Sequence, residues 1–165
     1  RHGMSFIESE EQVAIRETVR RIAGEFGYEY WAAKTRAGER THELWRALGR
    51  GGFLGINVPE VYGGGGAGIR ELAIVCEEVA AVGCPLLMIV VSPAICASIL
   101  AAHASDELKR RWLPGIASGE RKMAFAITEP DAGSNSHNIA TTAERVGDAY
   151  RLLGSKTFIS GVDES

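Results

Sequence analysis

The chain has 165 residues, 45% of them hydrophobic and 24% charged, which is typical of a soluble globular protein that can bury a core without disulfide bonds. Its 18 basic and 21 acidic residues give a net charge of −3, which argues against nucleic-acid binding because that function requires a basic surface. Three cysteines cannot all pair with one another, and their spacing matches no zinc motif. We therefore expect Cys76, Cys84 and Cys96 to be small buried side chains in a reducing, cytoplasmic compartment.

Two features near the start and middle of the chain concern targeting. Residues 1–3 precede Met4, which we expect to be the native start. Residues 79–102 contain no charged side chain and are long enough to cross a bilayer. Pro85 and Pro93 interrupt this run, and its serines and alanines make it only weakly apolar. A buried core helix is therefore expected there in place of a membrane span.

The chain begins with the apolar periodicity of a helix. Between Ile15 and Tyr30, apolar residues recur at spacings of three and four, which predicts one long amphipathic helix. Ser5 or Ser9 is placed to cap its start, and the glutamates that follow suit the positive end of the helix dipole.

Four more helices are predicted before residue 120. They are expected at residues 42–48, where Gly51-Gly52 ends the helix, at 69–82, at 86–103 and from about 106 onward. Ser105 is placed to cap the last of them, Trp112 is expected to pack inward, and Pro114-Gly115 are expected to break it. The intervening residues 53–68 are predicted to form a loop.

The pattern changes near residues 119–122, where we place the boundary between a helical domain (1–120) and a β domain (121–165). An extended run is expected at 123–128, a turn-rich loop at 129–138, a hairpin from 141–146 and 150–153 around Gly147-Asp148, and a further strand at 157–160. So few strands leave unpaired edges and an unfinished core. The predicted fold is therefore mainly α, an all-helical domain followed by the first strands of a truncated antiparallel β domain.

Several common functional motifs are missing from the sequence. The glycine run at 63–66 lacks the Lys-Ser/Thr pair of a phosphate-binding loop, and no Gly-x-Gly-x-x-Gly follows a first strand. The histidines have no partners at metal-ligand spacing, so no metal site is predicted. There is also no Gly-x-Ser-x-Gly segment that could present a nucleophilic serine.

One segment contains groups that can bind an anionic ligand. In residues 125–135 (FAITEPDAGSN), an apolar run ends at Thr128, and a turn containing Gly133 and Ser134 follows. The free backbone N–H groups of such a turn can donate several hydrogen bonds to a pyrophosphate. The same residues would also suit an ordinary hairpin, so the chemistry alone does not choose between the two.

The amino-acid sequence of this segment resembles that of the acyl-CoA dehydrogenase family. The resemblance lies in residues 126–134 (AITEPDAGS) and in residues 156–161 (KTFISG), with supporting matches at 54–64 and 112–120. Order and spacing agree over nearly the whole chain from Met4. The resemblance implies a helical N-terminal domain, a middle antiparallel β-barrel and a C-terminal helical bundle, of which this chain covers the first and begins the second.

The resemblance also implies a reaction. Enzymes of the family desaturate an acyl-CoA between Cα and Cβ: a glutamate removes the α-proton while hydride passes to N5 of FAD, which supplies the redox chemistry. An electron-transfer flavoprotein is the implied acceptor, and a homo-oligomer (dimer or tetramer) the implied assembly. The family's catalytic glutamate lies C-terminal to this segment, so no catalytic residue is assigned here and the chain alone is expected to be inactive.

The family pattern assigns contacts with FAD to eight residues: Phe125, Ile127, Thr128, Gly133, Ser134, Phe158, Ile159 and Ser160. Thr128 is implied to hydrogen-bond the pyrimidine edge of the flavin, Phe158 to pack on the ring face opposite the substrate, and Ser160 to reach N5. Ser134 is implied to contact the pyrophosphate and the acyl-CoA. Glu129 is implied to be structural, with no catalytic role.

The sequence departs from the family pattern at three positions in the two motifs. Asp131 stands where glycine is common, Phe158 where tryptophan is common and Ser160 where threonine is common. Two alternatives stay open: a flavin monooxygenase of the same fold, and a non-catalytic helical interaction module.

Overall fold

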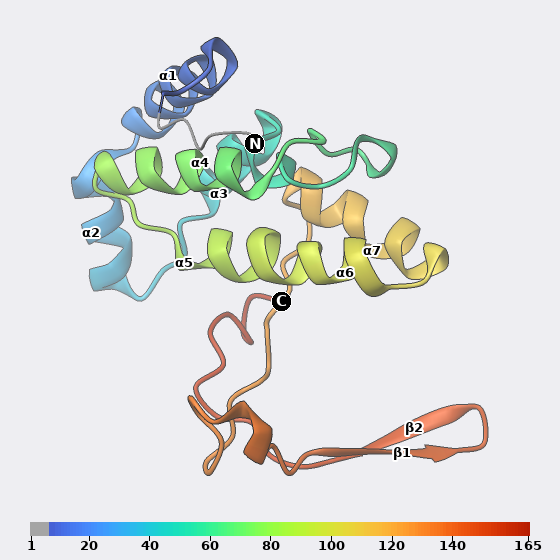
Figure 1. Cartoon of the computed structure of the whole chain (residues 1–165). Coiled ribbons are helices and arrows are strands. Elements are labelled where there is room, and N and C mark those ends of the chain that lie inside the picture. The colour runs from blue at the N-terminus through green and yellow to red at the C-terminus, as the bar shows by residue number, and fades with distance from the viewer. Residues whose placement is uncertain (1–6) are drawn as a thin grey trace.

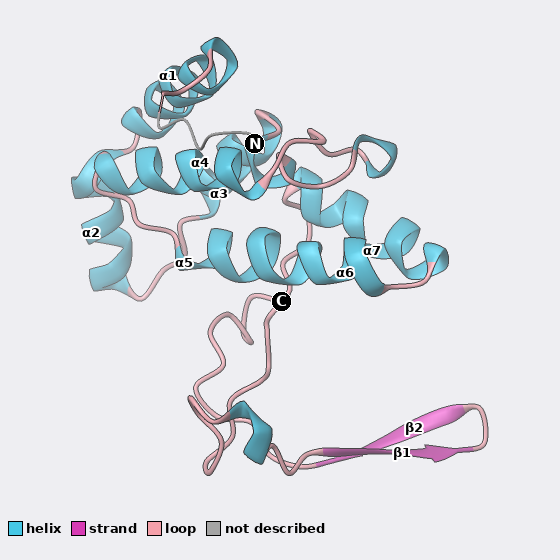
Figure 2. Cartoon of the chain, viewed as in Figure 1, coloured by secondary structure: helices cyan, strands magenta, loops and turns pink. Residues whose placement is uncertain are grey.

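The computed structural model describes residues 7–165, so the expected start at Met4 and the possible cap at Ser5 lie outside the described residues. A layer of helices comes first, and a single β-hairpin projects away from it (Figures 1 and 2). The elements, in chain order, are α1 (Glu10–Gly24), α2 (Gly27–Ala37), α3 (His42–Arg50), the short 3-10 helices η1 (Phe53–Gly55) and η2 (Glu60–Tyr62), α4 (Ile69–Ala81), α5 (Leu87–Ile89), the π-helix η3 (Val90–Ala97), α6 (Ser98–His103), α7 (Asp106–Ser118), the 3-10 helix η4 (Ser136–Asn138), β1 (Thr142–Val146) and β2 (Ala149–Leu153). The mainly α fold with a short antiparallel sheet is confirmed.

The hydrophobic core lies in the helical part. Val19 of α1, Leu44 and Leu48 of α3, and Leu72 and Val75 of α4 are almost wholly buried and belong to one cluster. A second cluster joins the inner face of α7 to the loop before α4; its buried members are Val58, Ala97, Leu113, Ile116 and Ala117. Burial of these apolar side chains supplies the main driving force for the helical part to fold.

The predicted long helix is two helices, α1 and α2. The helix α1 ends at Gly24, and Gly27, the first residue of α2, adopts φ +70°, a left-handed conformation that departs from the regular α-helical path. The predicted apolar face is nevertheless correct, because Ile15, Val19, Ile22, Phe26 and Tyr30 all pack in the main core. The face therefore continues across a break that its periodicity did not show.

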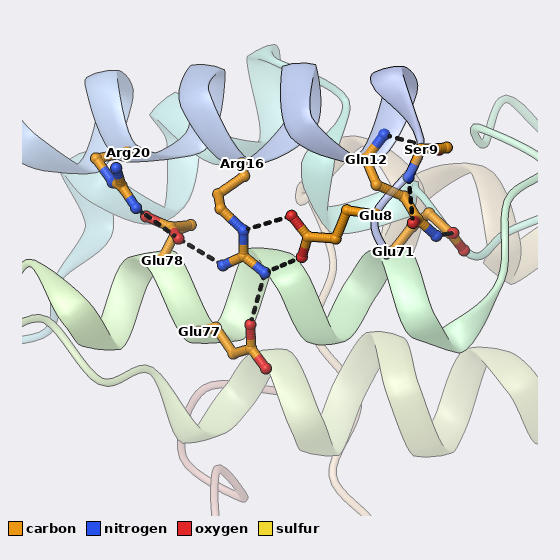
Figure 3. A network of polar contacts seen from close by, with 8 residues as sticks. All are labelled: Glu8, Ser9, Gln12, Arg16, Arg20, Glu71, Glu77 and Glu78. Atoms are coloured by element: carbon orange, nitrogen blue, oxygen red, sulfur yellow. Dashed lines mark hydrogen bonds and ion pairs between the residues drawn. The ribbon is translucent and has the colours of Figure 1, made fainter. Parts of the chain in front are cut away.

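The start of α1 is held by polar contacts to itself and to α4. The predicted cap Ser9 is confirmed: its hydroxyl accepts from the Gln12 N–H at 3.2 Å, and the Gln12 side chain accepts from the Ser9 N–H at 3.0 Å. Further along α1, Arg16 and Arg20 both donate to Glu78 of α4, at 2.6 and 2.7 Å (Figure 3). Arg16 also binds Glu8, and it binds Glu77 at 2.9 Å. The carboxylate of Glu78 is almost wholly buried, and these two arginines satisfy its charge.

The predicted helix at 86–103 is confirmed as a continuous helical run of α5, η3 and α6. Pro93 lies inside it and cannot donate a backbone hydrogen bond, and the helix widens there to π geometry. The carbonyl of Pro93 accepts from the side-chain amide of Asn57 at 2.9 Å. Among the described residues, no helix combines the length and apolarity that crossing a bilayer would require.

Two expectations for α7 are wrong and one is confirmed. Ser105 caps the helix, as predicted, by accepting from Leu108 N–H at 3.3 Å. The helix runs through Pro114 to Ser118 and ends at Gly119, which has φ +79°. Trp112 is only half-buried, whereas Trp45 of α3 is 4% exposed and donates its indole N–H to the Gly119 carbonyl at 2.8 Å. Leu113, one residue along, takes the inward position expected of Trp112.

The β part contains the predicted hairpin and no other strand. β1 and β2 pair antiparallel, with Glu144 opposite Arg151, around a turn in which Gly147 has φ +63°. The strand expected at 157–160 is wrong, because this segment is irregular and Phe158 has φ +54°. The run 123–128 is likewise not a paired strand.

The three cysteines are all free thiols. Cys84 and Cys96 are buried, as expected, but Cys76 is only half-buried. Burial raises the pKa of all three thiols, so each is held in its neutral form.

Candidate functional site

The two segments singled out by the sequence lie against each other. The Thr157 N–H donates to the Thr128 carbonyl at 3.0 Å, and the Lys156 ammonium donates to the Ile127 carbonyl at 3.0 Å. Thr128 is therefore hydrogen-bonded to the residue that precedes Phe158, although 30 positions separate Thr128 and Phe158 in the chain. The segments carrying the candidate residues are thus brought together at one end of the hairpin.

Glu129 is the hub of this junction. Its side chain is almost wholly buried and accepts from Lys156 Nζ at 2.8 Å, from Ala140 N at 2.7 Å and from Thr141 N at 3.0 Å; the Thr141 hydroxyl also donates to it. The Lys156 hydrogen bond, followed by those from Thr141 and Ala140, lowers the pKa of Glu129 to about 2. A carboxylate that holds its proton so weakly is a poor general base at neutral pH.

The turn after Glu129 presents free donors. Glu129 and Ala132 exchange backbone hydrogen bonds of 3.0 and 3.1 Å, and the side-chain amide of Asn138 donates to the Asp131 carbonyl at 2.9 Å. Within residues 7–165, the N–H groups of Gly133 and Ser134 donate to no protein acceptor. A Cβ added at Gly133 would meet nothing within 4 Å, so the surface above this turn is open.

The predicted hydroxyl ligands are also without protein partners. In the described part of the chain, no hydrogen bond joins the side chains of Thr128, Ser134 or Ser160 to another residue. Phe158 is 92% exposed and holds a positive φ that L-residues rarely adopt. Ile127 is 37% exposed. Free hydroxyls, free amides and a bare aromatic ring are groups that suit a planar heteroaromatic ligand with a diphosphate.

The candidate residues do not all line one cavity of the described chain. The Glu129–Asp131 turn borders a hollow of about 390 Å³ together with Asn138 and Thr141. Ser160 instead borders a hollow of about 370 Å³ against the helical part, beside Met88 and Lys122. Phe125 and Ile159 are half-buried. Thr128 and Ser134 border neither hollow.

Ser160 is held near the helices by charged contacts. Asp163 pairs with Arg40, and Glu164 pairs with Lys122 and, at 3.6 Å, with Arg40. The Lys122 ammonium also lies 4.5 Å from the centre of the Trp45 ring, a distance suited to a cation–π contact.

Sequence reasoning missed Lys156 as a residue that shapes this site. It was part of the matched stretch 156–161, but nothing in its local pattern showed that it would pair with Glu129, 27 positions away. In the described residues, no group of three or more His, Cys, Asp or Glu side chains is placed to hold a metal ion.

Residues 9–120 match the family model described as the acyl-CoA dehydrogenase N-terminal domain. The chain therefore belongs to the acyl-CoA dehydrogenase family. It is 56% identical over 161 residues to the acyl-CoA dehydrogenase FadE12 of Mycobacterium tuberculosis, an alignment that covers 98% of this chain and 42% of the relative. The chain thus spans about two-fifths of the length of this curated relative.

Solved structures agree with the sequence match. The glutaryl-coenzyme A dehydrogenase in complex with glutaryl-CoA has a TM-score of 0.92 and 32% identity to this chain, covering 98% of it and 42% of that structure. A structure titled PigA with FAD and proline has a TM-score of 0.83 and 27% identity, covering 96% of this chain and 42% of that one.

Proposed function

We propose that this chain forms the helical domain (1–120) and the start of the β domain (121–165) of an FAD-dependent acyl-CoA dehydrogenase. The reaction would be α,β-desaturation of an acyl-CoA thioester, with hydride transfer to the flavin. The observation that carries the proposal is the hydrogen bond between Thr157 N and the Thr128 carbonyl, which joins the two family-like motifs beside the exposed ring of Phe158.

The residues would divide the work of holding FAD, which supplies the hydride-accepting ring. The Thr128 hydroxyl would donate to the pyrimidine edge, where negative charge collects on reduction, and the Ser160 hydroxyl would donate near N5. Phe158 would cover the ring face opposite the substrate. The N–H groups of Gly133 and Ser134 would bind the pyrophosphate, with Ser134 also facing the acyl-CoA. Phe125, Ile127 and Ile159 would supply apolar contacts around the ring.

The proposal extends to partners and assembly. An electron-transfer flavoprotein would reoxidise the flavin, the enzyme would be a homo-oligomer, and it would work in the cytoplasm. Support comes from family membership and from its relatives, which include the acyl-CoA dehydrogenase FadE12 and the structure titled PigA with FAD and proline. No residue of 1–165 is proposed as the catalytic base, so this chain alone is expected to give no acyl-CoA-dependent dye reduction.

The flavin content of the full-length gene product tests the proposal. We expect the purified protein to carry FAD, and the double variant Thr128→Ala, Ser160→Ala to lose about fivefold or more in FAD affinity, because each hydroxyl contributes about 0.5–1.5 kcal/mol. The matched control is Ser155→Ala, an exposed hydroxyl of the same region that is assigned no flavin contact. A folded but colourless protein that takes up no FAD would favour the non-catalytic interaction module.

A further inference from the structure

The β part of the chain has almost no apolar core. Between residues 121 and 165, only Glu129 and Ala132 are buried. The large apolar side chains of the hairpin are exposed, by 51% at Val146, 66% at Tyr150 and 72% at Leu152. Within residues 121–165, hydrophobic burial therefore contributes little to the relative positions of the segments, and polar contacts join them.

One carboxylate gathers three separate segments. Through Glu129, the turn at 127–129 is joined to Ala140 and Thr141 at the start of the hairpin and to Lys156 after its end. Lys156 closes the arrangement by also donating to the Ile127 carbonyl at 3.0 Å. Charged hydrogen bonds of this kind are stronger and more directional than neutral ones.

The backbone around this carboxylate is built for close approach. A Cβ added at Gly154 would collide with the side chain of Thr141, so the two ends of the hairpin can meet only because residue 154 is glycine. This contact places Thr141 where its hydroxyl can donate to Glu129. The arrangement is therefore specified by several residues and not by the ion pair alone.

We propose that Glu129 and Lys156 are positioning residues that set the spacing between Thr128 and Phe158, and thereby the fit of the flavin ring between them. The inference rests on the proposed function. Thr128 directly precedes Glu129 in the chain, and Phe158 lies two residues after Lys156. The ion pair between Glu129 and Lys156 measures 2.8 Å. Neither positioning residue touches the flavin; each acts through its neighbour.

The test compares, in the full-length protein, the loss of Lys156, which follows the hairpin, with the loss of Arg151, which lies in β2. Lys156→Met keeps the side-chain length but removes the charge and both donated hydrogen bonds. Arg151→Met removes the exposed ion pair with Glu144 at 2.9 Å, which lies along the strands. Lys156→Arg retains the charge and serves as the conservative rescue.

The readouts are the FAD dissociation constant, measured by quenching of flavin fluorescence, and the visible absorbance and circular dichroism of the bound flavin. We expect Lys156→Met to weaken FAD binding by about tenfold or more and to alter the flavin spectrum. Arg151→Met should change the constant by no more than about twofold, as exposed ion pairs contribute little. Lys156→Arg should lie closer to wild type than Lys156→Met does.

Hydrogen exchange separates failure of this inference from failure of the proposed function. In Lys156→Met, the amides of Ala140, Thr141 and Thr157 should exchange faster, while those of α1 and α4 should not change. If wild type binds FAD and Lys156→Met binds it with unchanged affinity and spectrum, the positioning role is overturned. If wild type binds no FAD, the proposed function falls, and the positioning role falls with it whatever the exchange data show.

Discussion

At the residue scale, the side chains expected to touch a ligand stay a prediction from the sequence, and the residues that hold them in place became visible only in the structure. Thr128 and Ser134 stand in a stretch that is highly specific for the family, and Phe158 stands in one that is specific only together with the other matches. The partners of Glu129 and Glu78 come from 27 and 62 positions away, as Lys156 and Arg16 show. Spacing rules apply within one helix or strand, so they cannot find an ion pair formed by tertiary packing.

The pKa of Glu129 makes a pH prediction at this scale. Because folding lowers it from an ordinary value of 4.5 to about 2, the carboxylate contributes stability above pH 4.5, and this contribution is lost as the pH falls toward 2. In NMR spectra recorded over this range, the Ala140 and Thr141 amides should shift as their acceptor is protonated. In Lys156→Met the same shifts should begin at a higher pH, because the largest cause of the lowered pKa is gone. Amides that stay unchanged until the helices unfold would contradict the assignment.

At the element scale, periodicity located the helices and missed their interruptions. The helix α4 was expected at 69–82 and lies at Ile69–Ala81, because its apolar stripe is continuous and glycine or proline flanks the segment. The break between α1 and α2 was missed because the apolar face continues across it, and α7 was wrongly ended because proline was taken as a terminator. The prediction of a strand at 157–160 was wrong because a strand must pair with a neighbouring strand. In the part of the chain that the structure describes, this segment makes only one backbone hydrogen bond to another segment, from Thr157 to Thr128.

The break at Gly27 is testable with a pair of glycine variants. Gly27→Ala should destabilise the protein by about 1 kcal/mol, because alanine resists the left-handed conformation at φ +70° even though its Cβ meets nothing. Gly24→Ala, three residues earlier in α1, also meets nothing and should be neutral or stabilising by about 0.5 kcal/mol. Urea denaturation of both variants gives the comparison. Equal effects would mean that the backbone at residue 27 is not constrained as described.

At the scale of the whole molecule, the two parts differ in what holds them together. The helical part has two apolar clusters and the network of α1 with α4, whereas the β part depends on Glu129 and on the charged contacts of residues 163–164 with Arg40 and Lys122. The class of the fold was predictable from the sequence because the helical part has strong periodicity and belongs to a known family. The path of residues 154–165 was not, since it is set by individual polar contacts between distant segments.

We propose that this chain helps to build a flavin site for oxidising an acyl-CoA. The most direct test of this proposal is to add saturated acyl-CoA thioesters of several chain lengths, without oxygen, to the FAD-loaded full-length protein. We expect bleaching of the flavin absorbance band and formation of the α,β-unsaturated thioester. A flavin band that no acyl-CoA bleaches, in a protein that consumes oxygen once its flavin is reduced, would contradict the dehydrogenase and favour the flavin monooxygenase.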